Sequence, residues 1–236
     1  MFWFRETIGE VEVAVTDRQG GVSVGGRSSL DLGGAGRAAA PDVVTNHARL
    51  ADALGVEELR AMSQVHGADV VMVDGAGLPE CDALVTDVRG VALLVRVADC
   101  TPVVLADAAA GLVAVAHAGR AGLVDGVVPA TVEAMRSRGA TTVRAWVGPR
   151  ACGRCYELPE EMADAVDAAV PGTRSTTSWG TPAVDVGAGV LAQLEAHDVE
   201  ARDLGADSCT IEDERFFSYR RQGAESGRFG ALVVLR

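Results

Sequence analysis

The sequence is poor in aromatic residues and in positive charge. Aromatic residues make up 4% of the 236 positions and hydrophobic residues as a whole make up 48%, so a sizeable core must consist mainly of valine, alanine and leucine. Lysine and arginine together number 21 against 33 aspartates and glutamates, a formal net charge of −12 at pH 7. We therefore expect no nucleic-acid partner, because a protein must neutralise phosphates in order to bind them.

Long apolar runs and export signals are missing as well. No stretch approaches the roughly 18 uncharged apolar residues of a membrane-spanning helix, so we expect no contact with a membrane. Residues 1–6 contain no basic segment followed by an apolar one, so we expect no signal peptide. Five cysteines are an odd number in a chain too long for a disulfide scaffold. Together these features predict reduced thiols and a cytoplasmic protein.

Hydrophobic patterning predicts strands in the middle of the chain and helices around them. Strands are expected at 10–15, 61–65, 70–73, 83–86, 91–96, 103–106, 112–117, 142–147 and 231–235, and helices at 42–54, 122–137, 157–170 and 184–197. We expect Asp42 to cap the first helix, Gly55 to end it, and Pro129 to kink the second helix or to mark its first turn. With no internal repeat and no clear linker, the pattern predicts one mixed α/β domain over residues 1–236. Its β-sheets are flanked by helices, and two of them can pack face to face.

A cysteine and two histidines stand where apolar runs end. Cys100 follows the run 91–97, His117 follows the run 112–116, and His66 lies in a Gln-Val-His-Gly sequence. Alone, a histidine at a strand end is usually structural, and a buried cysteine behaves as a small hydrophobe. Together, the three side chains can form a metal site with an open fourth position, as a catalytic zinc requires. Cys100 and His117 can instead form a nucleophile and its base, and the residues alone leave both interpretations open.

Other features carry weaker signals. The glycine-rich segment 20–36 matches neither the P-loop nor the dinucleotide-binding motif, and we interpret it as an ordered active-site loop. His47 falls on the apolar face of the first predicted helix and is interpreted as a packed or hydrogen-bonded side chain. Cys152 and Cys155 form a CxxC pair without a second pair, a weak metal or redox signal. Glu157 falls at an expected helix start, where the dipole favours a carboxylate, so Cys155 and Glu157 can line a site or serve the helix alone.

The densest basic cluster of this acidic chain lies near its end. It contains Arg220, Arg221 and Arg228, with aromatic residues beside them. The cluster can be a solvated loop, or it can be an anion site, because arginine binds phosphate and carboxylate through two parallel hydrogen bonds. The neighbouring aromatic side chains can hold a flat ring.

Five motifs in a fixed order carry a family resemblance. They are Gln64-Val65-His66-Gly67, Ala98-Asp99-Cys100-Thr101-Pro102, His117-Ala118-Gly119, Gly148-Pro149 with Cys155-Tyr156-Glu157, and Ser218-Tyr219-Arg220-Arg221 with Gly227-Arg228. From about Thr16 to its end, the chain resembles the bacterial laccase-domain family, long described as polyphenol oxidases. Members of that family are associated with purine nucleoside phosphorylase and adenosine deaminase activities, and some with the editing of peptidoglycan precursors.

The resemblance implies a fold and a set of functional residues. The fold is a mixed α/β domain, similar also to the catalytic domain of a cysteine-dependent toxin deamidase. His66, Cys100 and His117 are implied as the metal ligands, with zinc as the usual ion and copper as the alternative. We assign catalytic roles to Cys100, Cys155 and Glu157, and substrate binding to Asn46, Arg120, Arg220, Arg221 and Arg228. The role of Glu157 rests on analogy with zinc deaminases of another fold, in which a glutamate that is not a ligand moves protons.

The chain departs from the family pattern close to the third ligand. Arg120 stands where the family has tryptophan in its His-Ala-Gly-Trp-Arg/Lys-Gly motif, and Ala121 stands where it has a basic residue. Asp31 replaces the asparagine of a Ser-Leu-Asn-Leu motif, and His47 replaces the arginine that usually follows Asn46. Arg120 can stand in for the lost basic residue. The departures concern residues near the substrate and leave the three metal ligands in place.

The sequence therefore predicts a zinc enzyme that acts on purine nucleosides, with nucleoside and phosphate as its small-molecule partners and a monomer or homodimer as its assembly. The expected reactions are phosphorolysis of adenosine- and inosine-type nucleosides to base and ribose 1-phosphate, and deamination of adenosine, for which zinc lowers the pKa of a bound water toward about 7.

Three alternatives remain open at this stage. The first is a zinc- or cysteine-dependent hydrolase that edits mis-assembled peptidoglycan precursors, whose negative charge also suits the arginine cluster. The second is a copper-dependent polyphenol oxidase, although the chain has only four histidines and a multicopper oxidase needs many more. The third is a binding module without enzymatic activity.

Overall fold

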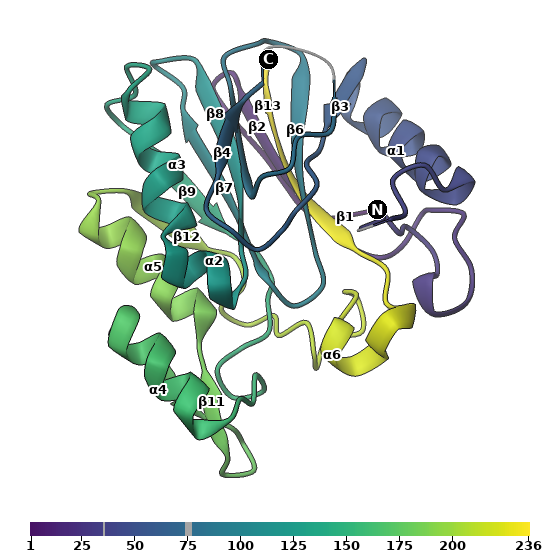
Figure 1. The fold of residues 1–236 in the computed structure, drawn as a ribbon. Coiled ribbons are helices and arrows are strands. Elements are labelled where there is room, and N and C mark those ends of the chain that lie inside the picture. Colours follow the sequence, from purple (N-terminus) through teal and green to yellow (C-terminus); the bar gives the residue numbers. More distant parts are fainter. Residues whose placement is uncertain (35, 74–76) are drawn as a thin grey trace.

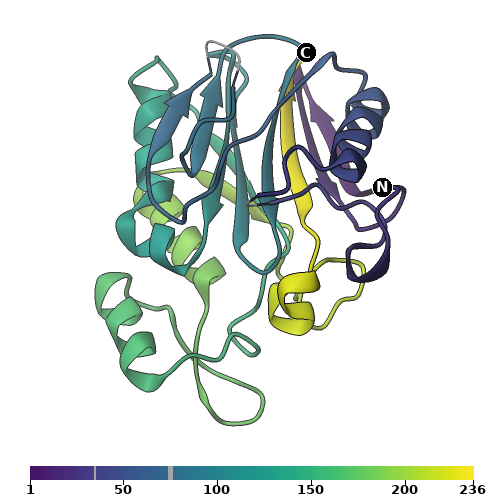
Figure 2. The same cartoon turned by 45° about the vertical axis from the view of Figure 1, so that its right-hand side comes forward.

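The computed structural model describes residues 1–34, 36–73 and 77–236. It has a mixed α/β fold in which two β-sheets face each other and helices cover their outer faces (Figures 1 and 2). The predicted fold class, with mixed sheets flanked by helices, is thereby confirmed. None of the helices in these ranges is long and apolar enough to cross a membrane.

The first sheet has five strands in the order β1-β2-β13-β6-β3. The strands are β1 (Phe2–Ile8), β2 (Val11–Thr16), β13 (Phe229–Leu235), β6 (Val91–Val97) and β3 (Glu58–Arg60). Neighbours run antiparallel except β3 and β6, which are parallel. The last strand of the chain therefore lies in the middle of a sheet whose other strands come from the first half of the sequence.

The second sheet has six strands in the order β12-β9-β7-β8-β5-β4, and a separate hairpin pairs β10 with β11. The strands are β12 (Glu200–Asp203), β9 (Arg144–Val147), β7 (Thr101–Asp107), β8 (Leu112–Ala118), β5 (Ala83–Thr86), β4 (Val70–Met72), β10 (Arg174–Thr176) and β11 (Pro182–Val184). Strands β6 and β7 follow each other in the sequence but belong to different sheets. The chain thus crosses from one sheet to the other at residues 98–100.

Helices form the two outer layers. They are α1 (Pro41–Leu54), α2 (Arg120–Asp125), α3 (Val127–Arg136), α4 (Glu160–Ala169), α5 (Val186–Ala196) and α6 (Tyr219–Gln222), with short 3-10 turns η1 (Gly25–Arg27) and η2 (Gly223–Glu225). Helix α1 packs on the five-stranded sheet, and α2, α3 and α5 pack on the six-stranded sheet. Figure 2 shows α4 and its hairpin extending beyond the end of the sheets.

The core follows from the alternation of side chains along each strand. In β8, Val113 and Val115 point between the two sheets, whereas Ala114 and Ala116 face the helices on the other side. Strand β6 alternates in the same way, toward the second sheet and toward α1. Because both faces of these strands are buried, they are continuous apolar runs in the sequence.

Glycine and proline set the helix boundaries that differ from the predictions. The helix predicted at 122–137 is two helices, because Gly126 adopts a left-handed φ of 84° between α2 and α3. Pro129 lies in the first turn of α3, one of the two roles predicted for it. The helix predicted at 157–170 begins only at Glu160, because Pro159 holds an extended backbone before it. Glu157 therefore does not open a helix, and that part of the prediction was wrong.

Two further predictions concern the segment around α1. Ala40, rather than Asp42, is the N-cap residue of α1, and Asp42 lies in its first turn. Gly55 ends the helix with a left-handed φ of 69°, as predicted. The strand predicted at 61–65 was wrong, because β3 ends at Arg60 and the following residues form a loop.

Asp107 provides a test of how the second sheet is held together. Its carboxylate is 1% exposed and accepts backbone hydrogen bonds from Ala109 and Ala110 at 3.0 Å and from Thr141 and Thr142 at 2.7 Å. Burial raises its pKa, but the four N–H groups outweigh burial and leave the pKa below its usual range. A depressed pKa adds stability above the unfolded-state pKa of about 3.9, and this stability is lost as the pH falls through the folded-state value.

We therefore expect Asp107→Asn to lower the free energy of unfolding by about 1–3 kcal/mol at pH 7. The NH2 group of the asparagine is a hydrogen-bond donor, and it would face backbone N–H groups that are donors too. The difference from wild type should shrink below about pH 4. Urea unfolding at several pH values measures it, with the exposed Asp207→Asn as the control. An equal difference at pH 7 and pH 3 would contradict this electrostatic account.

Candidate metal centre and active site

His66, Cys100 and His117 meet at one point of the structure. One ligand atom from each lies within 4.8 Å of those of the other two, and Sγ of Cys100 is 3.7 Å from Nε2 of His66. The two imidazole rings lie edge to face, with their centroids 4.7 Å apart. Three residues spread over 52 positions of sequence thus form one cluster of nitrogen and sulfur donors.

Strand pairing explains why the three residues meet. Cys100 lies in the crossing between β6 and β7, immediately before β7 begins. Strand β8 runs antiparallel to β7, so that His117 is opposite Pro102 and close to Cys100. His66 lies in the loop between β3 and β4, with a left-handed φ of 64°. Gly119 leaves room for the cluster, because a Cβ atom there would lie 2.7 Å from Cδ2 of His66 and 3.3 Å from Sγ of Cys100.

Asp82 holds two of the three ligands and was not predicted from the sequence. Its fully buried carboxylate lies 2.7 Å from Nδ1 of His117, which leaves Nε2 of that ring for the cluster. The same carboxylate accepts backbone N–H groups from His66 at 3.0 Å and Gly67 at 2.7 Å. One side chain therefore fixes the ring of one ligand and the loop of another. Carboxylates in this position orient the histidines of metal sites and raise their basicity.

The surroundings of Cys100 also favour its charged thiolate form. Burial raises the pKa of Cys100, but the charge and hydrogen bonds of His117 and His66 outweigh it and lower the pKa to about 6. In turn, burial lowers the pKa of His117, while the Cys100 thiolate and the hydrogen bond to Asp82 raise it to about 9. In the absence of metal, the interactions within the cluster therefore favour the thiolate form of Cys100 and the protonated form of His117.

The donor set fits a metal ion. Two imidazoles and one thiolate are ligands that both zinc and copper accept. Three protein ligands with a fourth side open to a cavity is the arrangement of catalytic zinc sites. His66 is exposed and Cys100 is half-buried, so the ion and a substrate can reach the cluster from the same side.

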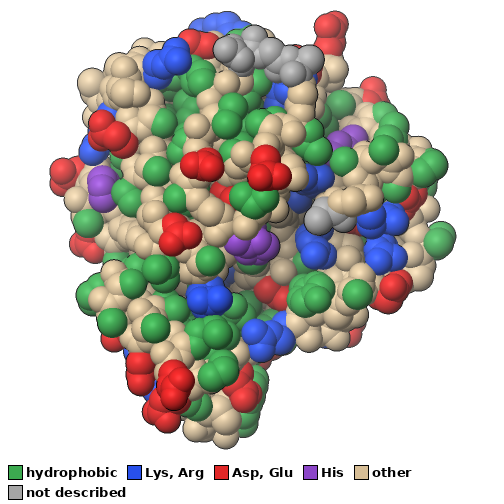
Figure 3. Space-filling view, viewed as in Figure 1, with side chains coloured by type: hydrophobic (Ala, Val, Ile, Leu, Met, Phe, Trp, Pro, Cys, Tyr) green, Lys and Arg blue, Asp and Glu red, His purple; other side chains and the backbone are tan. Residues whose placement is uncertain are grey.

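A cavity of about 840 Å³ opens in front of the three ligands. Its size falls within the range of small-molecule sites. On the face shown in Figure 3, a histidine and several basic side chains surround a hollow in the middle of the molecule. Of the four arginines predicted from the sequence to bind substrate, three line this cavity: Arg120, Arg220 and Arg228. Positive charge is thereby concentrated at one hollow of an acidic protein.

Two tyrosines line the same cavity, and an arginine guanidinium lies over the ring of each. The guanidinium of Arg220 lies 4.9 Å from the ring centre of Tyr156, and that of Arg228 lies 5.7 Å from the ring centre of Tyr219. These distances allow cation–π contacts. Burial and the charge of Cys100 raise the pKa of Tyr156, so its hydroxyl stays protonated and can donate a hydrogen bond.

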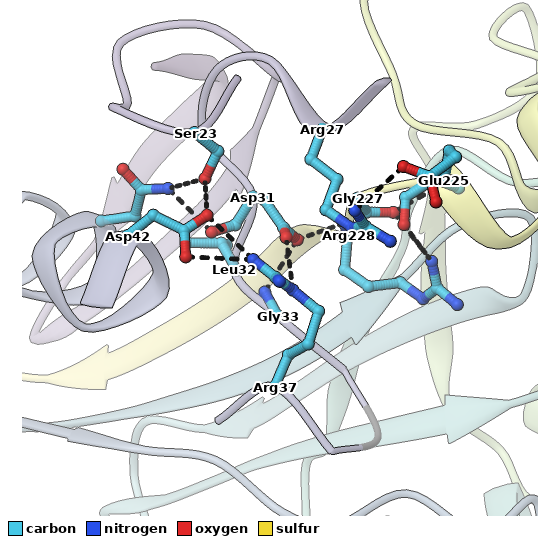
Figure 4. Close-up of polar contacts among 12 residues, drawn as sticks. Ser23, Arg27, Asp31, Leu32, Gly33, Arg37, Asp42, Glu225, Gly227 and Arg228 are labelled. Carbon is cyan, nitrogen blue, oxygen red and sulfur yellow. Dashed lines mark hydrogen bonds and ion pairs between the residues drawn. The ribbon is translucent and has the colours of Figure 1, made fainter. Parts of the chain in front are cut away.

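The glycine-rich segment borders the cavity on another side. Gly33, Gly34 and Gly36 line it, and residue 35 lies outside the described ranges. Figure 4 shows how the segment is held: the carboxylate of Asp31 accepts the N–H groups of Gly33 and Arg228, each at 2.9 Å. Asp31 thus joins the glycine-rich segment to Arg228, which lines the same cavity.

Four residues assigned from the sequence do not line the cavity in the described part of the chain. Asn46 is fully buried and holds the glycine-rich segment through hydrogen bonds to Ser23 and to the carbonyl of Asp31. The side chain of Arg221 donates to backbone carbonyls of Thr210, Ile211 and Phe216. The carboxylate of Glu157 accepts a hydrogen bond from Trp179 at 2.7 Å, and Cys155 is buried among other cysteines.

The remaining histidine prediction concerned His47. Its Nε2 lies 2.9 Å from the carbonyl of Leu32, and burial lowers its pKa. The prediction of a hydrogen-bonded rather than a ligating histidine is confirmed.

Arg96 is a second residue that sequence reasoning missed. It lies in β6, lines the cavity and is 5% exposed. Its Nη2 donates to the carbonyl of Met62, but Nε and Nη1 have no hydrogen-bond partner among the described residues. The sequence signal was a single arginine inside an apolar strand. Since buried donors are normally paired, these two unpaired donors make Arg96 a candidate for binding an anion in the cavity.

Comparison with known proteins identifies the family. Residues 12–236 match the family described as multi-copper polyphenol oxidoreductase laccase. The chain belongs to this family, which confirms the resemblance drawn from the five motifs.

Relatives and solved structures extend this result. The chain is 51% identical to "purine nucleoside phosphorylase ORF3" of Streptomyces griseus, covering 96% of this chain and 95% of that protein. It is 39% identical to the "purine nucleoside phosphorylase" of Deinococcus radiodurans, covering 94% of this chain and 88% of that protein. A crystal structure of a Neisseria meningitidis protein superposes with a TM-score of 0.86 at 31% identity, covering 99% and 98%. YlmD of Geobacillus stearothermophilus gives a TM-score of 0.83 at 29% identity, covering 97% and 93%.

Proposed function

We propose that this chain is a cytoplasmic, zinc-dependent enzyme that cleaves purine nucleosides with phosphate, giving the free base and ribose 1-phosphate. The observation that carries the proposal is the meeting of His66, Cys100 and His117 at the wall of a cavity that also contains arginine side chains. The names of the Streptomyces and Deinococcus relatives support this reaction class. Five free cysteines are typical of reducing surroundings, which is why we assign the enzyme to the cytoplasm.

Phosphorolysis requires an anion site beside the sugar, because a phosphate oxygen attacks C1′ while the bond from C1′ to the purine breaks. Arg96 and Arg228 are the arginines we assign to phosphate. Burial lowers the pKa of Arg96, the negative charge of Asp31 partly offsets this, and the positive charge of Arg228 lowers the pKa again. A phosphate bound between the two guanidinium groups reduces their mutual repulsion. It also accepts hydrogen bonds from the unpaired donors of Arg96, so both effects favour phosphate at this position.

The departing purine needs a proton or a hydrogen bond. Tyr156 can provide it, because its hydroxyl is protonated at neutral pH and lies in the cavity. Tyr219 adds an exposed ring on which a flat base can stack. His66, Cys100 and His117 would hold the zinc ion, which would supply Lewis acidity at this wall of the cavity.

Adenosine deamination is a second activity that we propose for the same cavity. Water adds to C6 of the purine and ammonia leaves, so a proton must pass from the water to the amine. Glu157 was assigned to this transfer by analogy, but its carboxylate is hydrogen-bonded to Trp179. We therefore assign the transfer to Tyr156, which lines the cavity: its hydroxyl gives a proton to the departing amine, and the resulting phenolate takes the proton that the attacking water releases.

The test is turnover of adenosine and inosine by the purified protein, with and without phosphate, followed by chromatography of the bases. We expect free adenine or hypoxanthine only with phosphate, and inosine from adenosine without it. The Cys81→Ala variant, which changes a buried cysteine outside the cluster, serves as the control and should match wild type. Absence of turnover by wild type, or equal turnover by Cys100→Ala, contradicts the proposal.

One observation favours a second candidate, the editing of peptidoglycan precursors. His117 lies between Asp82 and Cys100, the order of acid, base and nucleophile in a cysteine hydrolase. The cavity arginines also suit an anionic precursor. A deletion strain that accumulates mis-assembled muropeptides, restored by wild type and not by Cys100→Ala, would support this candidate if the purified protein leaves nucleosides unchanged.

The role of Arg96 leads to a prediction for phosphate. We expect Arg96→Met to raise the KM for phosphate by about 10- to 100-fold, the effect of losing hydrogen bonds to a charged group of about 1.5–3 kcal/mol. The kcat and the KM for nucleoside should change little, because the methionine keeps the apolar stem. Steady-state kinetics with varied phosphate measures this, with the exposed Arg89→Met as the matched control. An unchanged KM for phosphate would remove Arg96 from the anion site.

A further inference from the structure

A second group of ligand atoms lies apart from the cavity. Cys152, Cys155, Cys209 and Glu212 each place a sulfur or carboxylate oxygen within 4.8 Å of the others. None of the four lines the cavity described above. The three thiols are not joined in a disulfide, and Cys155 and Cys209 are buried. The sequence showed only the CxxC pair, and its third thiol comes from a segment more than fifty residues away.

Strand pairing brings the two segments together. Strands β9 and β12 are parallel neighbours, and the chain that follows each continues the contact through a bridge between Arg150 and Cys209. The N–H of Thr210 donates to the carbonyl of Arg150 at 3.0 Å. Cys209 therefore reaches the CxxC turn because of the register of the second sheet, and not through a flexible excursion of the chain.

One backbone N–H group points at a sulfur of this cluster. The N–H of Cys152 donates to Sγ of Cys209 at 3.4 Å. Hydrogen bonds of this kind orient and stabilise thiolates that ligate a metal. Three sulfurs so close together in a buried place repel each other as thiolates unless a cation lies between them.

We propose that Cys152, Cys155, Cys209 and Glu212 bind a second metal ion of the zinc type. Three thiolates and a carboxylate make four protein ligands, which is the closed, tetrahedral coordination of a structural zinc. Cys152 is half-buried and Glu212 is exposed, so the ion can enter from solvent. This inference does not depend on the reaction at the first site.

The proposed ion would brace one wall of the cavity. Tyr156 follows Cys155 directly, and Thr210 follows Cys209 directly. The hydroxyl of Thr210 donates to the carboxylate of Asp99 at 2.7 Å, and Asp99 precedes the ligand Cys100. An ion joining the two segments therefore fixes both a cavity tyrosine and the turn that carries the catalytic thiol.

The first measurement is the zinc content of protein purified without a metal-affinity tag and dialysed against zinc-free buffer. We expect about two zinc ions per chain in wild type and in Cys81→Ala, and about one in either Cys209→Ser or Cys100→Ala. One ion in wild type that persists in Cys209→Ser but is lost in Cys100→Ala overturns the proposal.

The second measurement does not depend on the first site. Metal-free Cys100→Ala protein is titrated with Co²⁺, so that thiolate-to-cobalt absorption comes only from the second cluster. We expect this absorption to be lost with an added Cys152→Ser change and the apparent affinity to fall at least tenfold with Glu212→Gln, an exposed change that spares the fold. Absence of thiolate-to-cobalt absorption, or a disulfide found by mass spectrometry in freshly purified protein in place of bound metal, overturns the proposal.

Discussion

Cys100→Ala is expected to bind one equivalent of metal less than wild type and to lose nucleoside phosphorolysis by about 10³-fold or more, the scale on which removal of a central catalytic group acts. The physical reason is the geometry of the cluster. The thiolate of Cys100 is the one anionic ligand among the three, and its charge offsets that of the cation beside His66 and His117. The measurements are zinc and copper content by elemental analysis and steady-state kinetics with inosine and phosphate.

A second substitution at Cys100 distinguishes a role as metal ligand from a role as nucleophile. Cys100→Asp keeps an anionic metal ligand at this position but removes the sulfur nucleophile. If Cys100 acts as a ligand, the aspartate variant retains part of the metal and measurable activity, and exceeds Cys100→Ala in both. If both variants keep full metal content and are equally inactive, Cys100 is a nucleophile and the proposed zinc mechanism is wrong.

The cluster could be predicted because Cys100 and His117 stand beside strand ends and because all three residues lie within recognisable motifs. What the sequence could not show is that they meet. Their meeting depends on the register that places His117 opposite Pro102 and on the crossing of the chain between the two sheets. Neither the pairing nor the crossing leaves a mark on residue type, so the distance between Cys100 and His66 follows only from the structure.

Asp82 and Arg96 were missed for a related reason. An aspartate before a strand and an arginine inside one are ordinary residues in a sequence, and their roles come from their surroundings. Asp82 matters because two ligand-bearing segments converge on its carboxylate. Arg96 matters because its guanidinium is buried with donors left unpaired among the described residues. Cys209 belongs with them, since only strand pairing brings it to the CxxC turn.

The fold itself was predictable where burial is strongest. Strands β6, β7 and β8 are buried on both faces, so their apolar runs identified β6 and β8 to within one residue and the central part of β7. Strands β10 and β12 lie at edges, contain polar residues and were not predicted. Their pairing partners, and not their own side chains, give them their extended form.

Asp82→Asn is expected to weaken zinc binding by about 10- to 100-fold, the usual effect of changing the partner of a metal-ligating histidine. The asparagine can accept from Nδ1 of His117 only by turning its amide toward the N–H groups of Gly67 and Val65, which the carboxylate oxygen now accepts at 2.7 and 3.2 Å. One of the two ligand segments must therefore lose its support. The loss of negative charge also makes His117 a less basic ligand. A competition titration against a coloured chelator measures the affinity.

The matched control is Asp69→Asn, an exposed carboxylate close to the same loop, which should bind zinc as wild type does. Urea unfolding of the metal-free proteins gives the structural part of the effect, since a buried donor left without an acceptor costs about 1–3 kcal/mol. A true positioning role requires the zinc affinity of folded Asp82→Asn to fall while its far-ultraviolet circular dichroism matches wild type. If stability falls but zinc affinity does not, Asp82 supports the loop alone, and the orientation of His117 must come from strand β8.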